Sequence, residues 1–225
     1  MIQLSVYVPT NDALMKKALG PTDYDSIEKA LGRARRSNGV INTIKIRDGK
    51  HVIHQGILKI NFAVQIVGES EVGSILEGGI HIQSDTDLQS EVVLKNLSIV
   101  GSEVSGVWNQ GKIRLRMDSC SIKNCTGHGI EVMNRAQVHL NNVSVQGCKC
   151  SGVVAKSGST IEICGDRSKS ITGNCTKNRT DDFGLNVKSS ASKIVVMGLT
   201  KERCAVENEG GGNYGGSGKI SFRKE

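Results

Sequence analysis

The chain has 225 residues, of which 37% are hydrophobic and 3% aromatic, with 27 glycines and 2 prolines. This length suits one all-β domain with many tight corners, and so few aromatic rings argue against a glycan-binding cleft, which usually needs ring platforms. The formal net charge is +7, but the charges are dispersed along the chain, so we do not expect nucleic acid as a partner.

The N-terminal part predicts a strand followed by an amphipathic helix. Residues 2–8 alternate between apolar and polar side chains, which is the pattern of a strand. From about Ser26 to Arg36 the apolar residues recur with helical spacing. Asp25 is positioned to cap this helix, and Glu28 is positioned to complete a capping box.

A repeat of 23 residues runs through positions 92–163. Apolar residues and glycines recur at this spacing without slippage, for example Val92, Leu115, Val138 and Ile161, or Gly106, Gly129 and Gly152. Within one unit the apolar residues lie two apart, which is the period of a strand, and units that cannot bury a core alone must stack. The repeat therefore predicts an all-β, right-handed, single-stranded parallel β-helix of about seven to eight rungs, with the helix as its N-terminal cap.

The segment before the repeat resembles a known family. A strand at residues 43–47 ends in an Asp48-Gly49 turn, and a later strand ends in Ile66-Val67-Gly68. With the preceding helix and the 23-residue rungs, this order resembles right-handed β-helix domains of the pectin-lyase-like superfamily over about residues 22–200. The resemblance implies the fold but no single activity, because this scaffold carries lyases, hydrolases, epimerases and many non-catalytic repeat domains. We place the chain in the repeat-containing, non-catalytic branch.

We interpret residues 1–225 as a single β-helix domain. Residues 1–40 form the N-terminal strand and capping helix, residues 41–205 form the rungs, and residues 206–225 form a glycine-rich loop and a terminal strand.

The register of the repeat fails after Ile163, which predicts an insertion at residues 164–183. Insertions in repeats often build a binding face. This one holds ionisable residues that could converge, and they are the weak candidates for catalysis: Lys177, Arg179, Asp181 and Asp182. Asp166, in the same insertion, is a candidate for binding. A solvated loop with local salt bridges is the competing interpretation.

Trp108 is the only tryptophan and follows the inward-facing Val107, so its side chain should face outward. Glu131 lies 23 residues later and should stack beside it. We interpret the pair as a candidate binding surface, because exposed tryptophans often anchor interfaces. The alternative is that Trp108 packs under a loop.

Two short motifs resemble those of polygalacturonase-type hydrolases, namely Gly127-His128-Gly129 and Asp181-Asp182. In those enzymes the aspartate pair precedes the histidine motif and lies on an adjacent rung. Here the pair follows, and two rungs separate it from the histidine. His128 also shares the phase of Ser105 and Ser151, so a corner residue is the preferred interpretation.

Seven cysteines are present, with no apolar segment typical of a signal peptide or a membrane span. We therefore expect buried thiols in a reducing compartment, and a cytoplasmic protein. Cys125, Cys148 and Cys175 occupy matching corner positions and should pack as small apolar groups. No metal-ligand spacing is found, so we expect neither a metal nor a cofactor.

Five Asn-x-Ser/Thr triplets occur in the chain. Without a secretory signal, their asparagines are better explained as corner residues than as glycan acceptors. They are Asn96, Asn124, Asn142, Asn174 and Asn178.

These patterns favour a non-catalytic β-helix module that recognises a protein partner through a sheet face or the insertion. The alternative is a polysaccharide-active enzyme of the same fold, a lyase, hydrolase or epimerase that acts on an acidic glycan. Such an enzyme needs a groove with stacked acids, basic residues and aromatic rings. No membrane association is expected.

Overall fold

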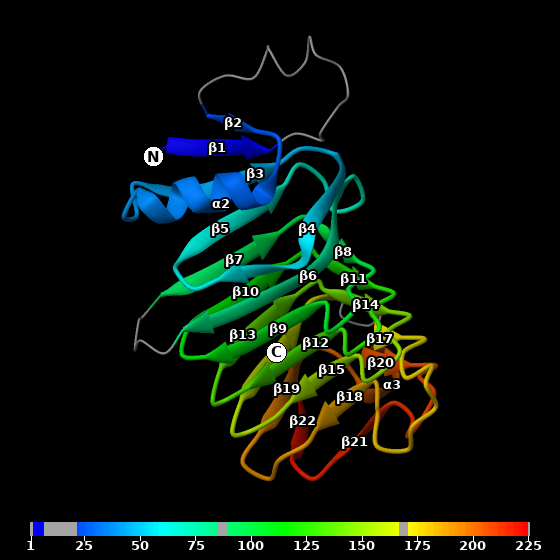
Figure 1. Ribbon diagram of the computed structural model, residues 1–225. Coiled ribbons are helices and arrows are strands. Elements are labelled where there is room, and N and C mark those ends of the chain that lie inside the picture. The colour runs from blue at the N-terminus through cyan, green and yellow to red at the C-terminus, as the bar shows by residue number, and fades with distance from the viewer. Residues whose placement is uncertain (1, 7–21, 85–89, 167–170, 225) are drawn as a thin grey trace.

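The computed structural model describes residues 2–6, 22–84, 90–166 and 171–224. The chain winds into a parallel β-solenoid of about seven turns, and each full turn places one strand on each of three faces (Figure 1). Every strand pair in the described residues is parallel. The predicted all-β parallel β-helix is therefore confirmed.

The first face is a ten-stranded sheet that runs the length of the stack. Its strands, in spatial order, are β2 (Asp23–Tyr24), β1 (Ile2–Val6), β3 (Ile41–Ile46), β5 (Val64–Gly68), β7 (Glu91–Lys95), β10 (Arg114–Asp118), β13 (Gln137–Asn141), β16 (Thr160–Cys164), β19 (Lys193–Met197) and β22 (Lys219–Arg223). Leu115 lies opposite Val92 on one side and Val138 on the other, as the 23-residue spacing predicts. Residues 7 and 8 of the predicted first strand lie outside the described residues.

The second and third faces belong to one sheet. They join at two long strands, β4 (Gly49–Ile60) and β6 (Ser74–Ser84), because the first half of β6 pairs with a second-face strand and its second half with a third-face strand. The second face continues with β8 (Ser98–Val100), β11 (Ser121–Lys123), β14 (Ser144–Gln146), β17 (Ile171–Thr172) and β20 (Ala205–Val206). The third face continues with β9 (Val107–Gly111), β12 (Ile130–Met133), β15 (Val153–Ala155), β18 (Leu185–Val187) and β21 (Tyr214–Gly216).

One apolar core runs through the stack. It is filled by inward aliphatic side chains from all three faces, such as Leu115, Ile122 and Ile130, each at most 1% exposed. Full burial of one such side chain contributes about 1.5–3 kcal/mol. Five of the seven cysteines are buried, and the stacked Cys125 and Cys148 are 0% exposed, so the predicted packing role of the corner thiols is confirmed.

The recurring glycines of the repeat are required by close packing. Gly106, Gly129 and Gly152 all lack a positive φ, so a left-handed backbone is not the reason for glycine at these positions. A Cβ at Gly129 would instead lie 2.2 Å from Cγ1 of Val145 and 2.6 Å from the carbonyl oxygen of Gly152. The inward side chain of the neighbouring strand thus fills the space that any side chain at the glycine would need. Four of the five asparagines predicted as corner residues have φ between 52° and 55°, namely Asn96, Asn124, Asn142 and Asn178. The fifth, Asn174, has no positive φ, and its buried amide donates a hydrogen bond to the carbonyl oxygen of Val145.

The N-terminal end of the stack is covered by helix α2 (Ile27–Arg36), as predicted (Figure 1). Its apolar stripe is buried, but its cap differs from the prediction. The N-cap is Ser26, whose Oγ accepts a hydrogen bond from the backbone N–H of Lys29 at 3.3 Å. Asp25 pairs with Nζ of Lys29 at 2.8 Å, and Glu28 accepts the backbone N–H of His54 at 2.8 Å, so neither completes a capping box.

A second, short helix, α3 (Lys201–Cys204), lies near the C-terminal end of the stack. In the part of the chain that the structure describes, no helix has the length and apolar character required to cross a bilayer.

Candidate functional site

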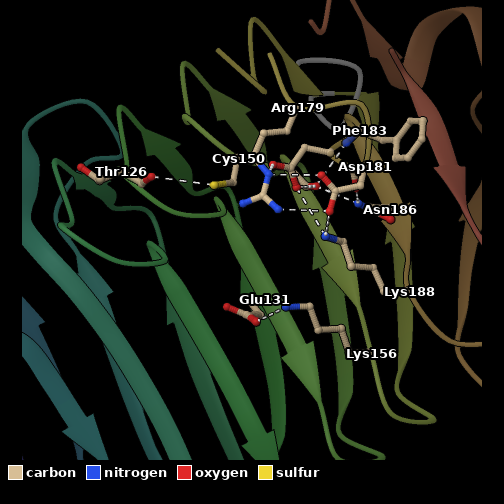
Figure 2. A network of polar contacts seen from close by, with 11 residues as sticks. Thr126, Glu131, Cys150, Lys156, Arg179, Asp181, Phe183, Asn186 and Lys188 are labelled. Atoms are coloured by element: carbon tan, nitrogen blue, oxygen red, sulfur yellow. Dashed lines mark hydrogen bonds and ion pairs between the residues drawn. The ribbon is translucent and has the colours of Figure 1, made fainter. Parts of the chain in front are cut away.

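The predicted insertion is divided in two, because β17 returns to the second face in the middle of it. Ile171 pairs with Val145, and Leu185 pairs with Val153. Both pairs are more than 23 residues apart, so the predicted failure of the register after Ile163 is confirmed. The second part of the insertion, residues 173–184, forms a loop between the second and third faces. This loop brings charged side chains to the start of β15 and β18 (Figure 2).

Asp182 is the buried centre of this charged group. Its side chain is only 3% exposed, and its Oδ1 accepts a hydrogen bond from Oγ of Ser151 at 2.9 Å. Nζ of Lys188 lies 3.6 Å from the same oxygen, and Nε of Arg179 lies 4.0 Å from Oδ2. A buried carboxylate is costly unless it is hydrogen-bonded and paired, and Asp182 has both kinds of partner.

Asp181 is exposed and shares its partners with Asp182. Arg179 places Nε 3.2 Å from Oδ1 and Nη2 3.3 Å from Oδ2 of Asp181, a two-pronged contact. Nζ of Lys188 lies 3.5 Å from Oδ2, so one ammonium group bridges the two carboxylates. The charge of Lys188, followed by the hydrogen bond and charge of Arg179, lowers the pKa of Asp181.

A second ion pair lies on the third face beside this loop, as Figure 2 shows. Oε1 of Glu131 lies 2.6 Å from Nζ of Lys156, and its Oε2 accepts a hydrogen bond from Oγ of Ser105 at 2.8 Å. Burial alone would raise the pKa of Glu131, but the hydrogen bonds from Lys156 and Ser105 outweigh it, and the pKa is lowered. Glu131 is therefore held as a carboxylate.

His128 lies within the electrostatic reach of both ion pairs. Burial is the largest cause of its lowered pKa, and the charges of Lys156 and Lys188 act in the same direction, partly opposed by Glu131 and Asp182. Its Nδ1 is buried and has no hydrogen-bond partner among the described residues. The backbones of His128 and the aspartate pair are two rungs apart, as predicted. The carboxylate of Asp182 is closer, because it is hydrogen-bonded to Ser151, which lies one rung from His128, and its charge acts on His128.

Two candidate residues of the insertion stand apart from this group. Lys177 is exposed and its charge acts on Cys150, whose pKa is raised first by burial and then by Asp182. Asp166 is exposed just after β16, and no hydrogen bond or ion pair within the described ranges joins it to Asp181 or Asp182. The predicted convergence thus holds for three of the four catalytic candidates.

Trp108 faces outward on the third face, as predicted, directly opposite Glu131 in the sheet. Its ring stacks on that of His81, with centroids 4.1 Å apart and planes within 8° of parallel. Its Nε1 donates to Sδ of Met133 at 3.3 Å. The ring is therefore held in a defined orientation with part of its surface open.

Lys156 and Lys188 complete the network and were missed by the sequence reasoning. Each lies four residues after a rung glycine, Gly152 or Gly184, so counting from these glycines would have placed both lysines in one column. Ser151 was noted only as a corner residue. Its hydroxyl also accepts a hydrogen bond from Nδ2 of Asn186 at 2.9 Å, which ties this corner to β18. Nδ2 of Asn186 also donates to the carbonyl oxygen of Asp181 at 2.8 Å, which ties the loop to β18.

The fold and this network define a parallel β-solenoid with a charge-compensated outer face. No group of three or more His, Cys, Asp or Glu side chains in the described residues is arranged to hold a metal ion. Comparison of the chain with protein-family models, with curated proteins and with solved structures gives no match.

Proposed function

We propose that this β-solenoid is a non-catalytic binding module that recognises a protein partner through the outer surface of its third face. The proposal is carried by one observation. Trp108 and Arg179, residue types that often dominate binding energies, lie beside a network in which each carboxylate already has a cationic partner. Such a surface is ordered before binding, so little side-chain entropy is lost when a partner docks.

The state of the acids supports binding over catalysis. A general acid needs a pKa raised toward neutrality, as burial without a partner produces. The pKa of Glu131 is lowered instead, because Lys156 and Ser105 stabilise its charged form. The pKa of Asp181 is also lowered. Both groups are suited to hold neighbouring cations in place.

The chemistry of the surface specifies the partner. The side chain of Arg179 is 61% exposed. Its guanidinium can therefore exchange its ion pair with Asp181 for an ion pair with a carboxylate of the partner. Trp108 offers an apolar face one rung from Glu131. The fitting partner is a protein surface with an acidic side chain next to an apolar or aromatic one.

A second candidate function is the processing of an acidic polysaccharide, as in the pectin-lyase-like superfamily that the sequence resembles. The observation in its favour is His128, which lies near two carboxylates and two ammonium groups. Lys156 and Lys188 could bind a uronate carboxylate, and His128 could move a proton. Membership of that superfamily is part of this alternative.

A cytoplasmic location is part of the main proposal. It is supported by the burial of five of the seven cysteines as thiols, which pack in the core without needing an oxidising compartment.

The two functions are separated by an activity assay. The purified chain would be incubated with a panel of acidic polysaccharides, following unsaturated products by absorbance and new reducing ends. We expect no turnover. Turnover that is lost in Glu131→Gln or Asp182→Asn, but kept in the surface control Arg36→Ala, would overturn the binding proposal in favour of the enzyme.

A partner is then sought by quantitative crosslinking in extracts of the source cells, comparing wild type with Trp108→Ala, Arg179→Ala and Arg36→Ala. We expect the same partner to lose at least about tenfold in capture with the first two variants, since hot-spot residues contribute about 2 kcal/mol or more. Equal capture by all of the variants would contradict the proposed surface.

A further inference from the structure

A different group of residues lies on the outer side of the first face, on strands β10, β13 and β16. Sγ of Cys164 lies 3.5 Å from Nε2 of His139. The other ring nitrogen of His139, Nδ1, lies 3.5 Å from Oε2 of Glu162. A thiol, an imidazole and a carboxylate are thus connected in series, which is the arrangement that activates a nucleophile and orients its base.

The ladder of the sheet holds this series in place. His139 pairs with Glu162 and Asn141 pairs with Cys164 across adjacent strands. Outward side chains of neighbouring parallel strands are about 5 Å apart, so the three groups meet without any loop having to order. Sγ of Cys164 also lies 3.6 Å from Oδ1 of Asn141 and 3.6 Å from the carbonyl oxygen of Leu140, which limits its rotation.

A cation lies on the same outer face, two strands away from the strand that carries the thiol. Arg116 stands opposite His139 in the sheet, with its Nε 2.8 Å from Oδ2 of Asp118, and its charge interacts with that of Cys164. The ionisable groups that face this site are Arg116 and Asp118 from β10, His139 from β13, Glu162 from β16 and Lys193 from β19.

A groove of about 360 Å³ adjoins the His139 and Glu162 end of this series, and Cys164 itself does not line it. His139 and Glu162 line it, and so do Glu91, Arg114 and Lys193. Its volume is in the range of small-ligand sites. Two cations and two carboxylates around a groove of this size suit a small zwitterionic ligand that carries carboxylate and ammonium groups.

Cys164 differs from the other cysteines. Five are buried, and burial raises the pKa of Cys120, Cys175 and Cys204 to about 12. Cys150 is partly exposed, but burial and the charge of Asp182 raise its pKa as well. Cys164 combines partial exposure with a neighbouring base, and Cys150 is therefore its matched control.

We propose that Cys164 is a reactive thiol that exchanges with a small disulfide of the glutathione class. Nε2 of His139 takes the proton from Sγ, and the thiolate attacks one sulfur of the disulfide. The disulfide bond breaks as the new bond to Cys164 forms. The second half leaves as a thiolate and takes the proton from the imidazolium, so the products are a mixed disulfide at Cys164 and one free small thiol.

Disulfide exchange fits the site better than acyl transfer. Acyl transfer needs donors aimed at a developing oxyanion. The polar groups beside the thiol are already used, since Nδ2 of Asn141 donates to Oδ1 of Asp118 at 3.3 Å, and the backbone N–H of Asn142 donates to the carbonyl of Cys164 at 3.1 Å. Exchange needs only an accessible thiolate and a disulfide in line with it.

The test is the rate of mixed-disulfide formation with oxidised glutathione, followed by intact mass and located by peptide mapping. We expect modification at Cys164, its loss in Cys164→Ser and its retention in Cys150→Ser. His139→Gln should slow it at least about tenfold near neutral pH, because a positioned base contributes about 10²–10⁴ in rate. The side chain of His139 is half-buried on the outer side of the sheet, 41% exposed, and is not part of the core, so this variant should fold even if a change at Cys164 does not.

Two further arms identify the chemistry. An uncharged disulfide, bis(2-hydroxyethyl) disulfide, should react more slowly, and Lys193→Ala should reduce the difference between the two disulfides. Equal labelling of Cys150, or an unchanged rate and pH profile in His139→Gln, would overturn the proposal. A burst of acyl-enzyme from an aryl thioester, with no mixed disulfide, would overturn it in favour of acyl transfer.

Discussion

Oγ of Ser151 donates a 2.9 Å hydrogen bond to Oδ1 of Asp182, which joins a corner of the regular repeat to the loop that interrupts it. Oγ of Ser151 also accepts a hydrogen bond from the backbone N–H of Phe183 at 3.2 Å. One hydroxyl group therefore anchors the loop to the stack, and the charged network of the third face depends on it.

Replacing Ser151 with alanine should destabilise the protein. Asp182 loses a hydrogen bond in a buried position, and the N–H groups that used Ser151 as an acceptor lose their partner. Each buried group left without a partner costs about 1–3 kcal/mol. Urea unfolding should show a loss of this size, whereas Ser217→Ala, at an exposed position, should change stability little. Equal midpoints for the two variants would contradict the anchoring role.

Replacing Lys188 with methionine should raise the pKa of Asp181. The charge of Lys188 is the largest cause of the lowered pKa, and methionine keeps much of the side-chain volume without that charge. The carboxyl carbon shift of Asp181, followed by NMR from pH 2 to 6, reports this change. Lys177→Met is the control, because Lys177 forms no ion pair with Asp181 among the described residues. A rise in the control alone would rule out the bridging geometry.

His128 should make the protein less stable in mild acid. Its folded-state pKa lies below the ordinary value of 6.5, mainly because burial disfavours the charged ring. The unfolded chain therefore binds this proton more readily, so the stability is fully present above pH 6.5 and is lost as the pH falls through the folded-state pKa. Urea midpoints between pH 8 and 5 should fall for the wild type.

The fall should be smaller in His128→Gln, which removes the titrating ring. It should not vanish, because burial also lowers the pKa of His51 and His81. The same slope in the variant and the wild type would show that His128 does not contribute.

Replacing Gly129 with alanine should disrupt one rung. The added Cβ would lie 2.2 Å from Cγ1 of Val145, which is too close for any real contact, so Val145 or the backbone must shift. Overpacking of this kind costs about 1–3 kcal/mol. Thermal or urea unfolding should show the loss. Gly32→Ala in helix α2, where the nearest atom is 3.5 Å away, should be neutral or stabilising. No loss at Gly129 would show that the rung can relax around a methyl group.

The sequence alone determined the stack, its register and the presence of a helix that covers its N-terminal end. A 23-residue repeat can be buried only if matching residues lie above one another, so Leu115 had to face Val92 and Val138. The helix was evident from its apolar stripe. The N-cap residue of the helix was not evident, because Asp25 and Ser26 are both residue types that cap helices. Only the folded first turn shows that Ser26 is the N-cap.

The tertiary structure alone decided which polar groups meet. Periodicity specifies which residues face outward, but it says nothing of how an inserted loop returns, so the contact of Asp182 with Ser151 was not foreseen. Likewise, the 23-residue spacing places His139 and Glu162 opposite each other on adjacent strands. The position of Cys164 beside His139 depends on side-chain rotamers across two strands, which only the folded sheet defines. Periodicity thus determines which face a residue occupies, and three-dimensional packing decides the chemistry on that face.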